Sequence, residues 1–396
     1  MAREMRTVNK YLKRYAEKEI SLLHSFPENI RFNHCIAIPA CDEKPDFVLR
    51  LKDSALSKNT LLILVVNQSP NANNKMFNAN QQLHVALSSA SSFIWKNENL
   101  QLLKQQELHI LLVDRYSPGK EIPEKEGVGR ARKLACDLAA TLFIKEALHS
   151  NWIYSTDADA HLPENYFSHS SENLAAQVFN FEHIGDTGPV LDATLQYEQA
   201  IKYYRKQLEV AGSPYAFYTL GSTLAVGIEA YCQVRGFPPR SGGEDFYLLN
   251  KLAKVGEIKY LERVCVSIEA RLSERVPFGT GPAVASILEN NKNGKPYCYY
   301  APQVFVELQT LLQNLNAIWQ RIDSNTSNNS HAPTLNNKIV AALTEIGIDN
   351  FVTHCKKQGY KQEAFAYQFK VWFDAFRTLK FIHHLQTHYY PATPLQ

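Results

Sequence analysis

The sequence has few of the features that mark membrane, secreted or nucleic-acid-binding proteins. Its most apolar stretch, Leu61–Val66, is only as long as a strand, and no run approaches the roughly 20 apolar residues of a membrane span. The 42 Lys and Arg residues nearly balance the 39 Asp and Glu residues, which disfavours binding to nucleic acid through bulk positive charge. We predict no membrane span and no nucleic-acid partner.

Paired cysteines and a secretion signal are also missing. The seven cysteines are scattered, and none belongs to a C-x-x-C pair. Residues 1–20 are rich in charge and lack the apolar centre of a cleaved signal peptide. Because an odd number of cysteines without a signal peptide fits reduced thiols, we expect a cytoplasmic protein.

The sequence does contain a series of short apolar runs that are typical of buried strands. They are His34–Pro39, Thr60–Val66, His109–Val113 and Trp152–Tyr154. Runs without polar alternation indicate a sheet that is covered on both faces. Between the last two runs, apolar residues recur at helical spacing over Val128–Leu148. Strands that alternate with helices predict an α/β sheet built from βαβ units.

The two ends of the chain differ from this central pattern. Residues 8–24 have the pattern of an amphipathic helix, and from about Gln303 the pattern is helical to the end, interrupted by a polar linker at 323–338. We therefore divide the chain into a helical lead-in over 1–33, a central domain over 34–300 and a helical region over 301–396. The length of 396 residues is sufficient for this arrangement.

Two acidic residues, Asp157 and Asp159, follow the fourth predicted strand at alternate positions. Side chains at i and i+2 of an extended backbone point the same way, so their carboxylates should converge. Such a pair suits a hard divalent cation, and Mg²⁺ or Mn²⁺ usually keeps open positions for substrate phosphates. The same pattern also occurs in solvated turns, so the surrounding motifs decide between the two interpretations.

Three further segments accompany the D-x-D pair in a fixed order. Ile38–Glu43 (IPACDE) ends the first strand, Gly127–Arg132 (GVGRAR) opens one helix, and Gly242–Asp245 (GGED) opens another. Together the four segments resemble the nucleotide-sugar glycosyltransferases of the GT-A fold, close to glycosyltransferase family 2. The resemblance covers roughly residues 34–282. It implies a GT-A-like, mixed, mostly parallel sheet flanked by helices, with the helical C-terminal extension outside it.

The resemblance also implies a UDP- or GDP-sugar donor, a divalent cation and an acceptor that the sequence does not identify. Asp42 and Glu43 lie just past a strand end, where open α/β sheets bind ligands, and Asn67 ends the second strand. These three side chains are candidates to bind the nucleoside. A polar turn before Pro45 explains Asp42 and Glu43 equally well. Family members usually carry Arg-Asn where Cys41-Asp42 stands here.

The second motif has a cationic character. Gly127 and Gly129 allow a tight turn at a helix N-terminus, which can favour an anionic phosphate. Cations at that position oppose the helix dipole, so a donor diphosphate would compensate them. The cations are Lys125, Arg130 and Arg132, of which Lys125 and Arg130 are the donor-binding candidates. The alternative is a solvated basic turn whose cations pair with Glu124 or Glu126.

Further donor contacts are expected after the last motif. Arg271 and Arg275 would reach the diphosphate, and Gly279–Gly281 could form a flexible flap. The family often has a third metal ligand in this zone, frequently His, and none is present here. We therefore expect Asp157 and Asp159 to hold the cation, Asp157 also contacting the donor, while water or the donor completes the shell.

The pair Glu244-Asp245 has two interpretations. Acidic residues in a first helical turn complement the helix dipole, which alone would explain them. The resemblance instead makes Asp245 the general base that takes the acceptor proton, with Glu244 positioning the acceptor. The resemblance thus implies a metal-dependent, inverting glycosyltransferase.

Two alternatives stay open. A sugar-phosphate nucleotidyltransferase is disfavoured because no glycine-rich phosphate loop with a following Lys lies near the first strand. A protein that keeps the fold to bind nucleotide sugars or act as a scaffold, without turnover, is disfavoured because both acidic pairs are present.

Overall fold

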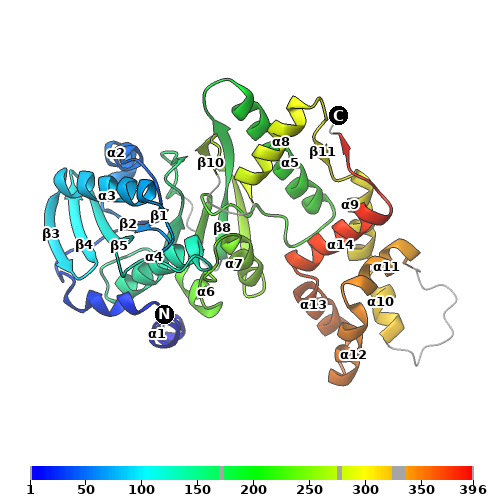
Figure 1. The fold of residues 1–396 in the computed structure, drawn as a ribbon. Coiled ribbons are helices and arrows are strands. Elements are labelled where there is room, and N and C mark those ends of the chain that lie inside the picture. Colours follow the sequence, from blue (N-terminus) through cyan, green and yellow to red (C-terminus); the bar gives the residue numbers. More distant parts are fainter. Residues whose placement is uncertain (1, 169–173, 274–278, 323–334, 395–396) are drawn as a thin grey trace. The chain divides into compact units, whose positions relative to one another are not determined.

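The computed structural model describes residues 2–168, 174–273, 279–322 and 335–394. The chain forms two compact units (Figure 1). Residues 1–195 and 219–285 form what we call the sheet unit, and residues 196–218 and 286–396 form the helical unit. The helical unit thus takes in a segment from the middle of the chain as well as its C-terminal part.

One large sheet forms the centre of the sheet unit. Its strand order is β3-β4-β5-β2-β1-β6-β9-β8-β10-β7. The strands are β1 His34–Ala40, β2 Thr60–Asn67, β3 Ser92–Asn97, β4 Leu100–Gln105, β5 Leu108–Arg115, β6 Trp152–Ser155, β7 Ala160–His161, β8 Leu174–Ile184, β9 Leu224–Gly227 and β10 Glu257–Glu269. All run in one direction except β4, β7 and β9. The sheet is therefore mixed and mostly parallel, as the sequence indicated.

The four predicted strands form the middle of this sheet. β1 pairs in parallel with β2 on one side and with β6 on the other, and β2 pairs in parallel with β5. Every residue of β2 is buried, which explains why its sequence is apolar without alternation. The helix α4, Gly127–Ile144, packs against β1 and β2 and ends before the predicted Leu148. The βαβ prediction is confirmed for this part of the sheet.

Of the remaining strands, the short β9 is apolar and fully buried, whereas β3, β4, β8 and β10 contain polar residues. β3 and β4 form an antiparallel hairpin at one edge, and β3 is largely exposed. β10 has no buried residue before Val264, alternates between buried and partly buried residues after it, and shifts register against β8 between Leu261 and Cys265. Because polar residues interrupt β3, β4, β8 and β10, a search for continuous apolar runs does not predict them.

The N-terminal segment consists of two helices instead of the single helix predicted over residues 8–24. They are α1 Ala2–Arg14 and the 3₁₀ helix η1 Lys18–Ser25. Between them Glu17 is extended, and its backbone N–H is bound by the Asp137 carboxylate of α4 at 2.9 Å. The backbone therefore leaves the helix to make a tertiary hydrogen bond. α1 packs on α4 and on α6, Ile228–Gln233.

Other helices connect the strands of the sheet unit or form the helical unit. The former are α2 Asp46–Asp53, η2 Ala55–Ser57, α3 Asn74–Ser89 and α7 Glu244–Leu252. The helices α5 Pro189–Val210 and α8 Thr280–Lys292 belong to both units. The helical unit adds α9 Pro302–Gln313, α10 Leu315–Ile322, α11 Asn337–Glu345, α12 Ile348–Gln358, α13 Gln362–Trp372, α14 Ala375–His388 and the short strands β11 Cys298–Tyr299 and β12 Thr393–Pro394.

The helical unit has a core of its own, rich in aromatic residues. Phe351, Phe365 and Phe369 are buried together, and Trp372 stacks on Phe351 with ring centroids 4.8 Å apart. The aromatic residues at helical spacing are thus used for packing between helices. No helix in the described part of the chain combines the length and apolarity that crossing a bilayer requires.

Candidate active site

Two arginines bring together the acidic residues that the sequence singled out. Asp157 and Asp159 follow β6, Glu43 follows β1, and Glu244 begins α7. Arg132 of α4 contacts Asp157 and Glu244, and Arg271, after β10, contacts Asp159 and Glu43. Segments far apart in the sequence therefore meet beyond the carboxyl ends of parallel strands, where open α/β sheets bind ligands.

Arg132 uses its whole guanidinium group. Nε donates to Glu244 Oε1 at 2.9 Å, and Nη2 donates to Asp157 Oδ1 at 2.7 Å. Nη1 donates to the Ser155 hydroxyl at 3.0 Å and to the Thr156 carbonyl at 3.3 Å. The residue is only 3% exposed. Burial alone would lower the pKa of Arg132, but the Asp157 and Glu244 carboxylates outweigh burial and raise it. Arg132 is thus a buried cation that joins the two acidic pairs.

Gly221 makes room for this guanidinium. A Cβ atom at Gly221 would lie 2.3 Å from Nη2 of Arg132, so the guanidinium would have to move to admit it. The glycine lies in the turn before β9, and the Ser155 hydroxyl donates to its carbonyl oxygen at 3.4 Å. The small residue in this turn is therefore explained by the arginine beside it.

The glycines of the GVGRAR motif are explained by close packing. A Cβ at Gly129 would lie 2.4 Å from the Pro238 carbonyl oxygen, and the Gly129 N–H donates to the Arg240 carbonyl at 2.9 Å. Gly127 has a φ of +39°, and a Cβ there would lie 2.8 Å from Cα of Ser241. The first turn of α4 thus packs directly on the segment that leads into α7.

Asp245 is partly buried beside Glu244 at the start of α7. Burial, together with the negative charge of Glu244, raises the pKa of Asp245 to about 7, from an ordinary value of 3.8. The Phe246 N–H, which donates to Oδ1 at 2.7 Å, and the Arg132 cation act in the opposite direction. A carboxyl group with a pKa near neutrality is suited to accept and release protons.

Arg271 forms the second bridge. Nη1 and Nη2 donate to the two carboxylate oxygens of Glu43 at 2.9 and 2.7 Å, and Nε donates to Asp159 Oδ2 at 2.9 Å. Burial alone would lower the pKa of Arg271, but the hydrogen bonds and charges of Glu43 and Asp159 raise it. Arg271 is about one-third exposed, so it is more accessible than Arg132.

The chemistry of these residues fits a divalent cation. Mg²⁺ needs only one or two protein carboxylates when water and phosphate oxygens complete its shell, and Asp157 and Asp159 would supply them. In the described ranges no group of three or more His, Cys, Asp or Glu side chains has the arrangement of a metal site. The carboxylates of the cluster nevertheless outnumber Arg132 and Arg271, so an anionic diphosphate would require additional positive charge.

The nucleoside candidates lie at the ends of β1 and β2. Asn67 is buried, and its side-chain oxygen has no hydrogen-bond partner among the described residues. Asp42 is exposed, with a φ of +56° in the left-handed region that Asp tolerates better than most residues. The fully buried Asn80 joins the two, because it accepts from the Asp42 N–H at 2.9 Å and donates to the Asn67 carbonyl at 3.3 Å.

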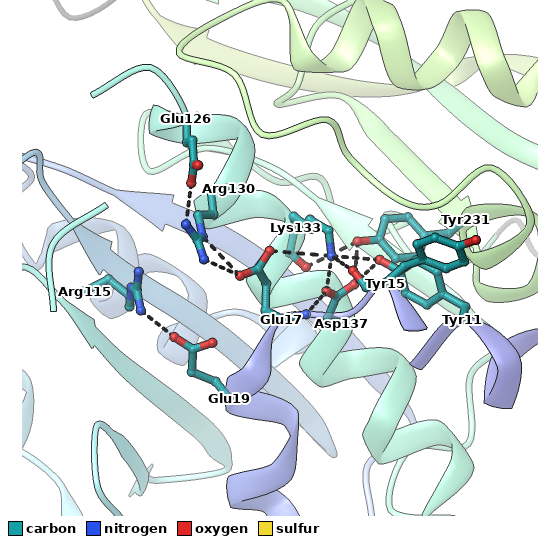
Figure 2. Close-up of polar contacts among 10 residues, drawn as sticks. All are labelled: Tyr11, Tyr15, Glu17, Glu19, Arg115, Glu126, Arg130, Lys133, Asp137 and Tyr231. Carbon is teal, nitrogen blue, oxygen red and sulfur yellow. Dashed lines mark hydrogen bonds and ion pairs between the residues drawn. The ribbon is translucent and has the colours of Figure 1, made fainter. Parts of the chain in front are cut away.

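Arg130 has carboxylate partners of its own (Figure 2). Its guanidinium group binds Glu17 at 2.9 Å and also binds Glu126, the partner that the sequence left open as an alternative. These carboxylates hold Arg130 on the side of α4 that faces Glu17, away from Asp157 and Glu244, and we therefore leave Arg130 out of the proposed donor site. Lys125 is exposed in the segment before α4, and Arg275 lies outside the described residues.

The sequence grouped Arg132 with Arg130 and gave it no role of its own. Residues two apart on a helix point about 200° apart, so only one of the two can face the acidic pairs. This spacing is the signal that could have separated them. Asn80 carried no such signal, because it lies in a polar segment of low complexity.

Comparisons with known proteins find similarity to solved structures but none to a family model or a curated sequence. No family model and no curated protein sequence matches the chain. One solved structure that matches is described as the crystal structure of GalNAc-T7 with UDP, GalNAc and Mn²⁺, at 12% identity and a TM-score of 0.36. The match covers 93% of this chain and 59% of that one. A likeness at this identity and score places the chain in no family.

Proposed function

We propose that the protein is a glycosyltransferase that uses a nucleotide-sugar donor and a divalent cation. The observation that supports this most directly is the arginine-bridged cluster, in which Asp157 and the pair Glu244-Asp245 meet at the carboxyl edge of the sheet. Transfer of a sugar from a nucleoside-diphosphate sugar needs one carboxylate to take the proton of the acceptor and others to hold the cation at the diphosphate of the donor. The cluster offers both.

The residues divide into two roles. Asp157 and Asp159 would hold the cation, which stabilises the charge that develops on the departing diphosphate. Asp245 takes the proton of the acceptor hydroxyl as the acceptor oxygen bonds to the anomeric carbon and the bond from that carbon to the phosphate oxygen breaks. The products are the glycoside, a protonated Asp245 and the nucleoside diphosphate. One direct displacement of this kind inverts the anomeric configuration.

The remaining residues of the cluster would bind the donor. Asn67 and Asp42 lie at the strand ends beside Glu43, where hydrogen-bond acceptors suit ribose hydroxyls or a base N–H. Arg271 lies between Glu43 and Asp159 and is partly exposed, so a diphosphate could form a charge-assisted contact with it by displacing one of these carboxylates. Its bidentate contact with Glu43 would keep it oriented while the donor is absent.

The test is nucleotide release from a panel of UDP- and GDP-sugars with Mn²⁺ or Mg²⁺, followed with and without excess chelator. The proposal predicts binding, seen as a rise in unfolding temperature, and cation-dependent release of the nucleoside diphosphate. A matched test variant is Asp159→Asn, which keeps the shape of the side chain and removes its charge. We expect this variant to lose the cation-dependent release. Binding without release under every condition would support the scaffold alternative, and absence of binding to every donor would overturn the proposal.

A further inference from the structure

The helix α4 is fixed from the side of the N-terminal segment (Figure 2). Its Asp137 is completely buried and accepts hydrogen bonds from the hydroxyls of Tyr11 and Tyr231, at 2.6 and 2.9 Å. Lys133, one turn earlier, donates to the same carboxylate at 2.6 Å and to the Tyr15 carbonyl at 2.7 Å. These contacts connect α4 to α1 and α6, so α4 can neither rotate nor slide without breaking them.

The opposite side of α4 carries Arg132 into the candidate active site. The guanidinium contacts the carboxylates of Asp157 and Glu244, which come from the turn after β6 and from α7. Gly221 leaves the space that the guanidinium fills, and Gly129 allows the first turn of α4 to approach the segment before α7. Arg132 is therefore held in place by its own helix and by the elements that it joins.

We propose that Arg132 is a positioning residue that holds the donor-side carboxylate Asp157 and the acceptor-side pair Glu244-Asp245 in one fixed arrangement. The inference rests on the proposed function and adds a role that the sequence did not assign. Arg132 is buried and its donors are directed at protein oxygens, so it acts through Asp157 and Glu244 and is not itself a catalytic residue. Only a planar, forked cation can bind both carboxylates and the β6 end together.

Arg132 could act through the shape of its guanidinium group or through its positive charge, and different substitutions test these two contributions. Arg132→Lys keeps the positive charge but replaces the fork with a single ammonium group. Arg132→Gln removes the charge. Gly221→Ala leaves every charged residue in place and inserts a methyl group where Nη2 lies, since a Cβ there would be 2.3 Å away. The Ala variant therefore displaces the guanidinium even if the variants at residue 132 fail to fold.

Steady-state turnover of the active nucleotide sugar gives the first readout. We expect Arg132→Lys and Gly221→Ala to lower kcat roughly 10–100-fold, because the two acidic groups lose their alignment, and to raise the donor KM as well, because Asp157 also holds the cation that binds the donor. The matched control is Arg205→Lys in the helical unit, a buried arginine that pairs with Glu209 at 3.2 Å, and we expect it to keep the wild-type kcat. Wild-type kcat in folded Gly221→Ala would overturn the proposal.

A second readout does not depend on turnover. The charged groups that influence Asp245 are Glu244 on its own helix, Asp157 after β6 and Arg132 on α4. ¹³C NMR of labelled aspartate carboxyls, assigned with Asp245→Asn, should show the Asp245 midpoint moving to higher pH in Arg132→Gln and staying near the wild-type value in Arg132→Lys. An unchanged midpoint in folded Arg132→Gln would refute the coupling. Failure of wild type to bind or turn over any donor, with these NMR shifts present, would refute the proposed function instead.

Discussion

Asp245→Asn distinguishes a base in the active site from an acid that merely complements a helix dipole, because the two roles predict stability changes of opposite sign. The raised pKa means that folded protein binds the Asp245 proton more tightly than unfolded protein does. Stability is therefore lost as pH rises from the ordinary value of 3.8 to about 7, and the loss is complete above that range. This window corresponds to a change on the order of a few kcal/mol in the unfolding free energy.

Asparagine has the shape of aspartate and carries no charge, so the variant avoids that cost. We expect Asp245→Asn to match wild type in stability near pH 4 and to become more stable at pH 8 by an amount on the order of a few kcal/mol. Turnover should fall roughly 10²–10⁴-fold, since the proton acceptor is lost. An acid whose only role is to complement the dipole would show the reverse, a loss of about 0.3–1 kcal/mol on substitution and nearly intact turnover.

The assay is urea unfolding of both proteins at a series of pH values between 4 and 8. Asp192→Asn serves as the control, because Asp192 is an exposed acid in the first turn of α5 and should lose a little stability at neutral pH. The reasoning is refuted if Asp245→Asn is less stable than wild type at pH 8, or if the difference between the two does not grow with pH.

Three further predictions concern other parts of the structure. Asp159→Ala should remove most Mn²⁺-dependent nucleotide binding, measured by calorimetry, while circular dichroism stays unchanged; equal binding in excess chelator would contradict the cation role. Asp137→Ala should lower the unfolding free energy by roughly 3–5 kcal/mol in urea titrations, because Lys133 loses its nearer counter-charge and the buried hydroxyls of Tyr11 and Tyr231 lose their acceptor, and a loss below about 1 kcal/mol would contradict this. Gly221→Ala should cost roughly 1–3 kcal/mol in the same titrations through overpacking against Arg132, and an unchanged midpoint would show that the turn has room.

The sequence was sufficient to predict the central strands and the acidic motifs. Strands such as β2 are buried on both faces, so nearly all of their residues are apolar and the sequence alone reveals them. Asp157 and Asp159 follow the predicted strand, but Ala158 and Asp159 lie in a turn, so the alternation of an extended backbone does not relate their two carboxylates, which contact different arginines. Local patterns of this kind depend on residues a few positions apart.

The sequence was not sufficient where the deciding partner lies far along the chain. Arg130 and Arg132 have the same chemistry, and their roles differ because Glu17 lies on one side of α4 and Glu244 on the other. The break between α1 and η1 likewise depends on Asp137, which binds the backbone of Glu17 across 120 residues of sequence. No local pattern contains that information, since each contact is set by how the elements pack.

The N-terminal segment has a consequence for the way the chain is made. Tyr11 leaves the ribosome long before its partner Asp137, which follows 126 residues later. At roughly 5–20 residues per second, α1 waits about 6–25 s for that carboxylate, and longer for Tyr231. During this interval Val8 and Tyr11, both buried in the folded protein, have no core to enter. The helix α1 can therefore reach its final packing only after α4 and α6 have been made, although it is synthesised before both.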